Sequence, residues 1–487
     1  MKRILSTERK ALYLRALTLA VPMMIQNGIT NAVGLVDSIM IGSQGTESTS
    51  AVSMCGQLIF VFNLAIFGAL SGPGIFGAQY FGNNDIEGVR KTFRIKIWVV
   101  IASVIAGICA FWFFGDFFVG LYLKGEAEGI DPVLALNKSR DYLRIMLIGF
   151  LPFALTQVYS STLRENNESK IPMIAGICGV AADILFNWIL IFGKFGFPAM
   201  DVKGAAIATV ISRFIEFTVI VIWSHLKRKR FVFLQGIYRT LLVEGKIAVP
   251  IIKKSIPILI NEFLWSAGII KTNQLLSERS LFVVPSLGIS AAISNLLNVV
   301  FVAMGSAVGI IIGQMLGAGE TKGIRRKANS LMWFTAFLSV GLSGTLIAIA
   351  PFFPKTYDVL PEVQYMATAF ITLTAFFFPL QGFLNAQYFT IRSGGKTFIT
   401  FLADSGFTWA INVLTVFLLI KFTNLNVYQI YAVSLSLDIL KVVFGAVMIR
   451  TGIWITNLVK EEGKEVSVLN PHVDEADDAD SKAWIKG

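Results

Sequence analysis

The chain has 487 residues, of which 55% are hydrophobic and only 15% are charged, and its formal net charge is +11. Soluble domains carry about 25% charged residues, so this composition excludes an ordinary soluble protein. The apolar length instead leaves room for about a dozen membrane-spanning segments.

Twelve apolar runs are long enough to cross a membrane as helices. In chain order they are 16–41, 51–81, 97–121, 141–163, 171–193, 204–225, 255–277, 285–316, 331–353, 363–391, 397–420 and 427–449. A transmembrane barrel would show short strands of alternating polarity, and the sequence has no such pattern. We therefore predict an all-α polytopic membrane protein with twelve transmembrane helices.

A basic stretch that begins at Lys227 (sequence KRKR) separates the spans into two sets of six. We expect an N-terminal six-helix lobe at 1–225, a cytoplasmic linker at 226–254, a C-terminal six-helix lobe at 255–455 and an acidic, disordered cytoplasmic tail at 456–487. Next to a span, the basic cluster is interpreted as an anchor near anionic lipid, so no nucleic-acid partner is expected.

Most of the 42 lysine and arginine residues fall in the N-terminal tail, the even-numbered loops and the C-terminal end. Cytoplasmic loops are enriched in these residues. We therefore expect a multi-pass protein of the cell membrane with both termini in the cytoplasm.

The two halves repeat each other. An offset of 235 residues pairs Gln79 with Gln314 and Gly82 with Gly317, and an offset of 228 pairs residues 162–164 (TLR) with 390–392 (TIR). Because each half has an even number of spans, both copies enter the membrane from the same side. This predicts a parallel repeat with its axis along the membrane normal, which permits alternating access around a central cavity.

Charged residues inside the spans need a partner or a function. Two pairs, Arg213 with Glu216 and Asp438 with Lys441, have the i, i+3 spacing that allows intrahelical neutralisation. We interpret both pairs as structural.

Asp37 in the first span has no basic residue one turn away, and Asp183 and Asn187 share one face of the fifth span. Together with Thr209 of the sixth span, they would supply oxygen ligands for a hard cation, or a carboxylate pair that shares a proton. A buried polar network that only ties the helices together remains the alternative.

The second half offers Glu262 and Trp265 in the seventh span and Asp404 in the eleventh. A carboxylate beside an aromatic ring is suited to an organic cation, and these residues are candidates for substrate binding or second-lobe coupling. Side chains that reach the membrane interface remain the alternative.

Nothing in the sequence favours an enzyme. The three cysteines lie in apolar runs, and neither histidine has neighbours at metal-ligand spacing. We expect no catalytic residues and no cofactor or metal other than a possible Na⁺.

Several motifs together resemble the multidrug and toxic compound extrusion family of secondary transporters, over residues 10–455. The motifs are residues 34–42 (GLVDSIMIG), 77–79 (GAQ) followed by Gly82, 187–193 (NWILIFG), 202–209 (VKGAAIAT) and 392–397 (RSGGKT). The resemblance implies two six-helix lobes that form a V and export driven by re-entry of Na⁺ or H⁺.

The resemblance also implies that Asp37 belongs to a first-lobe cation site with an Asn and an Asp of the fifth span and a Thr of the sixth. Family members commonly have the Asn before the Asp, whereas here Asp183 precedes Asn187. Many Na⁺-coupled members also pair a span-seven glutamate with a span-ten aspartate. Glu262 matches the glutamate, and the tenth span has no carboxylate at the corresponding place.

We therefore expect a monomeric Na⁺- or H⁺-coupled antiporter that is embedded in the lipid bilayer and exports small organic compounds, cationic or amphipathic. The alternative is a flippase for lipids or lipid-linked saccharides of a related fold family. A flippase should have a strongly cationic cavity to bind phosphate groups. The basic residues deep in the expected spans are Arg213, Lys271 and Lys441, and two of them have an acidic residue three positions away, so the sequence favours the antiporter.

Overall fold

The computed structural model describes residues 2–122, 131–357 and 359–461, with only the backbone described for residues 2–6, 35 and 461. Every regular element in this part of the chain is helical. The all-α prediction is therefore confirmed.

The first half contains six long helices. They are α1 (Lys2–Gly42), α2 (Thr46–Gly82), α3 (Ile86–Tyr122), α4 (Pro132–Glu165), α5 (Lys170–Phe192) and α6 (Asp201–Leu226). A short 3₁₀ turn, η1 (Val232–Leu234), lies in the connection to the second half.

The second half begins with α7 (Gly245–Ser277), α8 (Val283–Gly317), α9 (Ile324–Ile349), the 3₁₀ turn η2 (Phe353–Thr356) and α10 (Pro361–Ser393). The eleventh span is built from α11 (Thr397–Phe401), the π-helical segments η3 (Leu402–Gly406) and η4 (Thr408–Val413), and α12 (Leu414–Phe422). The twelfth is built from α13 (Val427–Ser436) and α14 (Asp438–Thr451), and α15 (Leu458–Glu461) follows.

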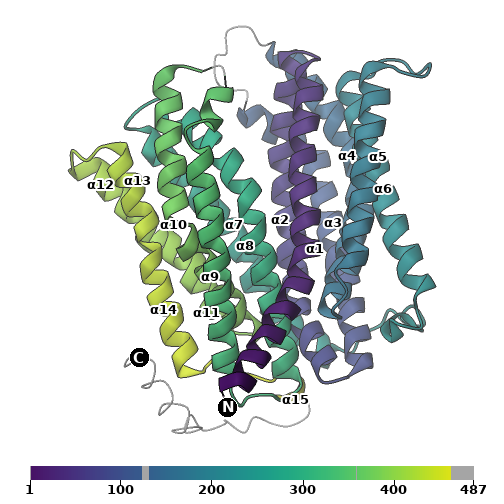
Figure 1. Cartoon of the computed structure of the whole chain (residues 1–487). Helices are drawn as coiled ribbons and strands as arrows, with labels where there is room; N and C mark the ends of the chain where they lie inside the picture. The colour runs from purple at the N-terminus through teal and green to yellow at the C-terminus, as the bar shows by residue number, and fades with distance from the viewer. Residues whose placement is uncertain (1, 123–130, 358, 462–487) are drawn as a thin grey trace.

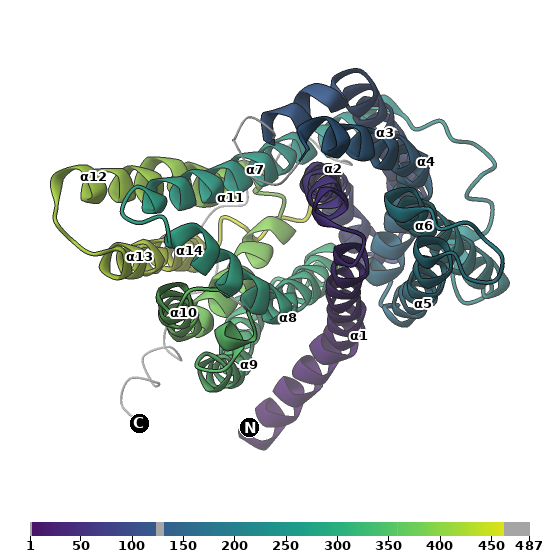
Figure 2. The same cartoon turned by 90° about the horizontal axis from the view of Figure 1, so that it is seen from above.

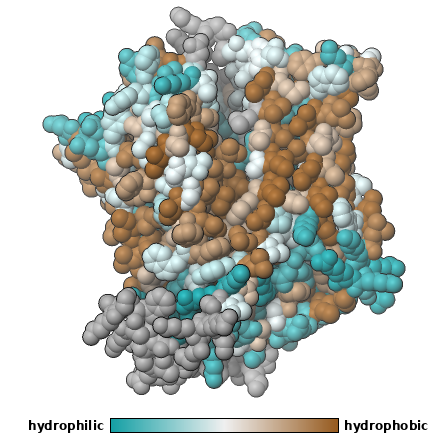
Figure 3. Space-filling model, in the orientation of Figure 1, coloured by the Kyte–Doolittle hydropathy of each residue, from teal (hydrophilic) through white to brown (hydrophobic). Residues whose placement is uncertain are grey.

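Eleven helical segments of the described chain are long and apolar enough to cross a membrane. The remaining long helix, α7, has 33 residues but includes Lys253, Lys254, Glu262 and Lys271. Apolar side chains form a broad band across the visible face, with polar side chains towards its lower end (Figure 3). This arrangement fits the twelve predicted spans.

The helices form two groups. In Figure 1, α1–α6 lie on the right and α7–α14 on the left, and the view from above separates the same groups (Figure 2). Helix α2 packs against both α7 and α8, and α1 packs against α8. The two halves therefore meet mainly through α1, α2, α7 and α8.

The predicted repeat is visible in the contacts between the halves. The side-chain nitrogen of Gln79 donates to the carbonyl of Ser393 at 2.9 Å, and that of Gln314 donates to the carbonyl of Glu165 at 2.7 Å. Glu165 and Ser393 are themselves 228 residues apart and end α4 and α10. Each glutamine therefore holds the end of a helix in the opposite half.

Two repeat-related glycines allow α2 and α8 to approach at this end. A Cβ atom on Gly82 would lie 1.9 Å from the carbonyl oxygen of Gln314, and a Cβ atom on Gly317 would lie 1.9 Å from that of Gln79. Only glycine permits such a backbone approach. We call this reciprocal contact the glycine crossing.

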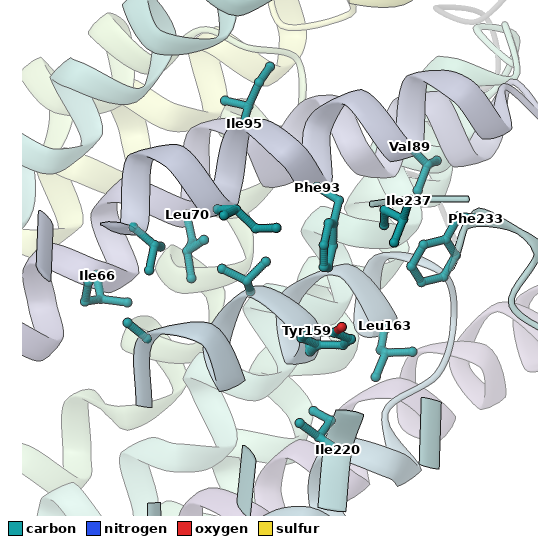
Figure 4. Packing of buried hydrophobic residues seen from close by; sticks show 14 of the residues in the cluster. Ile66, Leu70, Val89, Phe93, Ile95, Tyr159, Leu163, Ile220, Phe233 and Ile237 are labelled. Atoms are coloured by element: carbon teal, nitrogen blue, oxygen red, sulfur yellow. The ribbon is translucent and has the colours of Figure 1, made fainter. Parts of the chain in front are cut away.

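The largest apolar core lies mainly in the first half, between α2, α3, α4 and the connection after α6, and also includes residues of α7 and α15. Figure 4 shows Phe93 and Tyr159 packed among Leu70, Leu163 and Ile237. At its edge, the fully buried ammonium group of Lys96 lies 2.7 Å from the carboxylate of Glu165. A buried charge pair with this geometry needs further hydrogen bonds, and the ammonium group of Lys96 donates them to the hydroxyl groups of Ser161 and Thr162.

Two boundaries differ from the sequence analysis. Helix α7 starts at Gly245, within the stretch expected as linker, because the apolar residues of its first turns, among them Ile247 and Ile251, pack against the core of the first half. Residues 456–461 are part of the fold, since the amide of Leu458 donates to the side chain of Gln79 at 2.8 Å. The rest of the expected tail lies outside the described residues.

Candidate functional site

Asp37, Asp183 and Asn187 lie together between α1 and α5. The side-chain nitrogen of Asn187 donates to Asp37 at 2.9 Å and to Asp183 at 3.4 Å. The one-turn spacing on α5 places Asp183 and Asn187 on the face that packs against α1. Asp183 is 6% exposed and Asn187 is 1% exposed, so this cluster is largely removed from bulk solvent.

Helix α6 contributes two hydroxyl groups. Both Thr209 and Ser212 interact with the carboxylate of Asp183. The Ser212 hydroxyl also donates to the carbonyl of Thr209 at 2.9 Å. The structure therefore brings together all four residues expected for a first-half site, Asp37, Asp183, Asn187 and Thr209, which we call the carboxylate cluster.

Two oxygens of the carboxylate cluster are available for a ligand. Oδ1 of Asp183 and Oδ1 of Asn187 are buried and have no hydrogen-bond partner. Buried polar atoms are nearly always paired, so such atoms call for an explanation. Carboxylate, amide and hydroxyl oxygens are the ligands that a hard cation prefers, and the donor set fits Na⁺ or a shared proton.

Arg213 acts electrostatically on both carboxylates of the cluster, a role that the sequence analysis missed. Its guanidinium lies 3.5 Å from Glu216, which confirms the predicted intrahelical pair, and 4.7 Å from the ring centre of Phe153. One helix face of α6 therefore supplies a hydroxyl group and a positive charge to the same cluster.

The second half has a different network. Asn261 of α7 donates to Asp404 of η3 at 3.0 Å, and Lys441 of α14 lies 3.3 Å from Asp404 and 3.5 Å from Asp438. The predicted pair between Asp438 and Lys441 is thus confirmed, but Lys441 also neutralises Asp404. The network joins three helices at the π-helical segment of the eleventh span.

Glu262 lies beside Asn261 on α7, and its side chain lies close to Gly68 of α2. Arg392 and Asp404 both act electrostatically on this carboxylate. Trp265 lies one turn further along α7 and is 38% exposed. Glu262 therefore faces the opposite half, whereas Asp404 is held in an ion pair.

A cavity of about 260 Å³ lies between the halves. Helices α1, α2 and α4 line it from the first half, and α8 and α10 line it from the second half. Its charged lining residues are Arg164, Glu165 and Arg392. The sequence analysis missed both arginines because it placed them just beyond the ends of the fourth and tenth spans, although the repeated TLR and TIR motifs contain them.

The described residues hold no group of three or more histidine, cysteine, aspartate or glutamate side chains placed to bind a metal ion. The oxygen-rich carboxylate cluster has two acidic groups and obtains its other oxygens from an amide and hydroxyls. This composition is suited to a monovalent cation or a proton and differs from transition-metal sites, which use nitrogen and sulfur ligands.

Comparison with known proteins agrees with this architecture. The MatE family model matches residues 22–189 and again residues 257–418. The probable multidrug resistance protein NorM of Thermotoga maritima is 24% identical over 440 residues, which cover 84% of this chain and 86% of that protein. The probable multidrug resistance protein YoeA of Bacillus subtilis is 26% identical over 428 residues, which cover 84% and 88%.

Solved structures share the fold. A crystal structure of MATE in the bent conformation superposes with a TM-score of 0.81 at 17% identity and covers 94% of this chain and 98% of that chain. A crystal structure of a mutant of the Vibrio cholerae MATE transporter VcmN gives a TM-score of 0.80 at 15% identity and covers 94% of this chain and 99% of that chain. The two matches of the family model account for more than half of the chain, one in each half, so this protein belongs to the MatE family of multi-pass membrane transporters and is not an enzyme.

Proposed function

We propose that the protein is a cation-coupled antiporter that exports organic compounds from the cell. Relatives named as multidrug resistance proteins support a drug substrate. The proposed coupling depends on the carboxylate cluster. Its Asn187 side chain donates hydrogen bonds to Asp37 of α1 and to Asp183 of α5, and two buried oxygens of the cluster have no hydrogen-bond partner.

Coupling follows from the charge of this cluster. Two carboxylates close together in a buried site repel each other, and Arg213 offsets this repulsion only in part. Binding of Na⁺ or a proton neutralises the cluster and allows α1, α5 and α6 to pack more closely. A ligand shifts a conformational equilibrium only through different affinities for the two states, and the cation does so by favouring the more closely packed arrangement.

In the antiport cycle, the cavity that lies between the two halves opens in turn to one side of the membrane and to the other. The glycine crossing and the two glutamine contacts close one end of this cavity. That end lies among the even-numbered loops, which the distribution of basic residues assigns to the cytoplasm. We propose that the protein is a monomer in the cell membrane, has both termini in the cytoplasm, and exchanges Na⁺ or H⁺ for substrate.

The test is transport of ethidium by protein reconstituted in liposomes, with sodium and proton gradients imposed separately. Asp37→Asn is expected to abolish gradient-driven transport, because the amide carries no negative charge for Na⁺ or a proton to neutralise. The matched control is Asp116→Asn, since Asp116 is 53% exposed and pairs with Arg140 away from the cluster. Gradient-driven export by Asp37→Asn at the wild-type rate would refute the proposal.

The second candidate function is the transport of lipids or lipid-linked saccharides. The observation that favours it is the presence of Arg164 and Arg392 in the central cavity, since phosphate groups bind arginine well. Movement of a lipid-linked saccharide in the same liposomes, with no movement of ethidium, would select this function.

A further inference from the structure

The cavity between the halves contains two arginines that the repeat relates to each other. Arg164 ends the TLR motif of α4, and Arg392 ends the TIR motif of α10. Both side chains line the same cavity. Each half therefore contributes one guanidinium group to the lining of this cavity, at positions that the repeat relates.

Neither guanidinium is fully paired. Arg164 donates to Gln26 at 2.7 Å, but its Nε is buried without a hydrogen-bond partner. Arg392 is only 4% exposed, and its Nη1 is also buried without a partner. Leaving a buried donor of a charged group unpaired costs free energy, so each guanidinium group retains an unmet demand for a hydrogen-bond acceptor.

The acidic residues nearby do not remove this demand. Glu165 lines the cavity, but Lys96 already holds both of its oxygens at 2.7 Å. Glu216 acts electrostatically on Arg164, and Glu262 interacts in the same way with Arg392. Neither glutamate hydrogen-bonds the unpaired arginine nitrogens.

The rest of the lining is mainly apolar. Arg392 lies 5.7 Å from the ring centre of Phe67 and 5.3 Å from that of Phe389, so its charge rests on aromatic faces. Ile66, Leu70 and Phe153 extend the apolar wall. A ligand that fits this lining has an apolar body and a negatively charged end.

We propose that the cavity binds an amphipathic organic anion, with its carboxylate, sulfonate or phosphate group held between Arg164 and Arg392. Planar guanidinium groups bind such oxyanions through paired hydrogen bonds. The binding site follows from the geometry alone, whereas the claim that the anion is exported rests on the proposed transport function.

Anion binding would also hold the halves together. The carbonyl groups of Glu165 and Ser393, each next to one of the arginines, accept the hydrogen bonds from Gln314 and Gln79. An anion between the arginines therefore bridges the same two helix ends. Occupancy is expected to favour the arrangement with the glycine crossing closed.

The test measures equilibrium binding of 1-pyrenebutyrate and of the neutral 1-pyrenebutanol to the protein in nanodiscs of neutral phosphatidylcholine, with empty nanodiscs subtracted. The wild type should bind the anion at least about tenfold more tightly than the neutral analogue, as expected for charge-assisted hydrogen bonds. Equal affinity for the two probes would overturn the proposal without any variant being made.

Variants locate the site. Arg392→Gln and Arg164→Gln should each weaken binding of the anion by about tenfold or more and leave the neutral probe unchanged, and Arg392→Lys should recover part of the affinity. Arg144→Gln is the matched control, because Arg144 lies on α4 over the ring of Trp112 and outside the cavity. If Arg144→Gln weakens anion binding as much as Arg392→Gln does, the assignment is wrong.

Two further arms separate the sources of the anion and the two proposals. Competition by phosphatidylglycerol in the nanodisc identifies a lipid headgroup, and lack of competition identifies a free amphipathic anion; both outcomes require the arginine site. The two proposals can fail separately in the wild type. If 1-pyrenebutyrate binds preferentially but neither gradient drives transport, cation coupling is wrong. If a gradient drives transport but the two probes bind equally, the anion site is wrong.

Discussion

Gly317→Ala should open the end of the molecule at which α2 and α8 cross. The new methyl group would lie 1.9 Å from the carbonyl oxygen of Gln79, and ordinary contact begins at 3.4 Å. The obstacle is backbone, so no side-chain rotation relieves it. The helices must separate, and the separation disturbs Gln79, whose side chain bonds Ser393 at 2.9 Å and Leu458 at 2.8 Å.

The structure gives the size of the effect. Overpacking of this kind costs about 1–3 kcal/mol. Each hydrogen bond lost from Gln79 adds about 0.5–1.5 kcal/mol. Overpacking together with the loss of one of these hydrogen bonds amounts to about 2–4 kcal/mol, which lowers the ratio of closed to open molecules by roughly 30- to 700-fold. A closed state favoured a hundredfold in the wild type would then become a mixture or a minority.

The assay is double electron–electron resonance between spin labels at Lys170, the first residue of α5, and at Lys322, in the turn between α8 and α9. Both side chains are exposed. Labelling requires replacement of the three native cysteines, Cys55, Cys109 and Cys178. Gly317→Ala should transfer population to longer distances. Gly341→Ala is the control, because no atom lies within 4 Å of its new methyl group.

The reasoning fails if Gly317→Ala and Gly341→Ala give the same distance distribution as the wild type. The two helices could then accommodate a methyl group at the glycine crossing without moving apart. Thermal unfolding of both variants is measured in parallel. It establishes that both are folded at the temperature of the distance measurement, so that a change in the distance distribution reports on the arrangement of the halves.

Three other predictions follow from the charged groups. Lys96→Met should lower the free energy of unfolding by about 3–5 kcal/mol, because it leaves Glu165 charged and buried without its partner. The double variant Lys96→Met/Glu165→Leu should recover much of this loss. Equal melting temperatures for the single and double variants would contradict the prediction. Asn261→Leu removes the 3.0 Å bond to Asp404 and should cost about 1–3 kcal/mol, and an unchanged melting temperature would count against it. Na⁺ binding to the carboxylate cluster should weaken as the pH falls, because a carboxyl group that has taken up a proton is a poorer cation ligand. A calorimetric Na⁺ affinity that is independent of pH would refute the cluster as the site.

The candidate site shows where sequence reasoning succeeds. Helical spacing alone places Asp183 and Asn187 on one face, and the structure has them there. The intrahelical pairs were predictable for the same reason, since residues three apart on a helix are neighbours. Such distances depend only on the local geometry of one helix.

Contacts between helices required the tertiary structure. Lys441 reaches Asp404 as well as its predicted partner Asp438, because α14 packs against η3. Likewise, Arg213 acts on the carboxylate cluster only because α6 packs closely against α5. The spacing of residues along the chain contains no information on these approaches.

The sequence by itself determined that the chain is a polytopic helical membrane protein of two related halves, because apolar length and helical periodicity are local properties of the chain. It also showed that TLR and TIR correspond, without showing why. Only the tertiary structure decided that Arg164 and Arg392 face one cavity and that Gly82 and Gly317 cross, since these contacts join residues more than 200 positions apart. Packing of the two halves against each other, which no local preference specifies, created the cavity to which we assign the ligand.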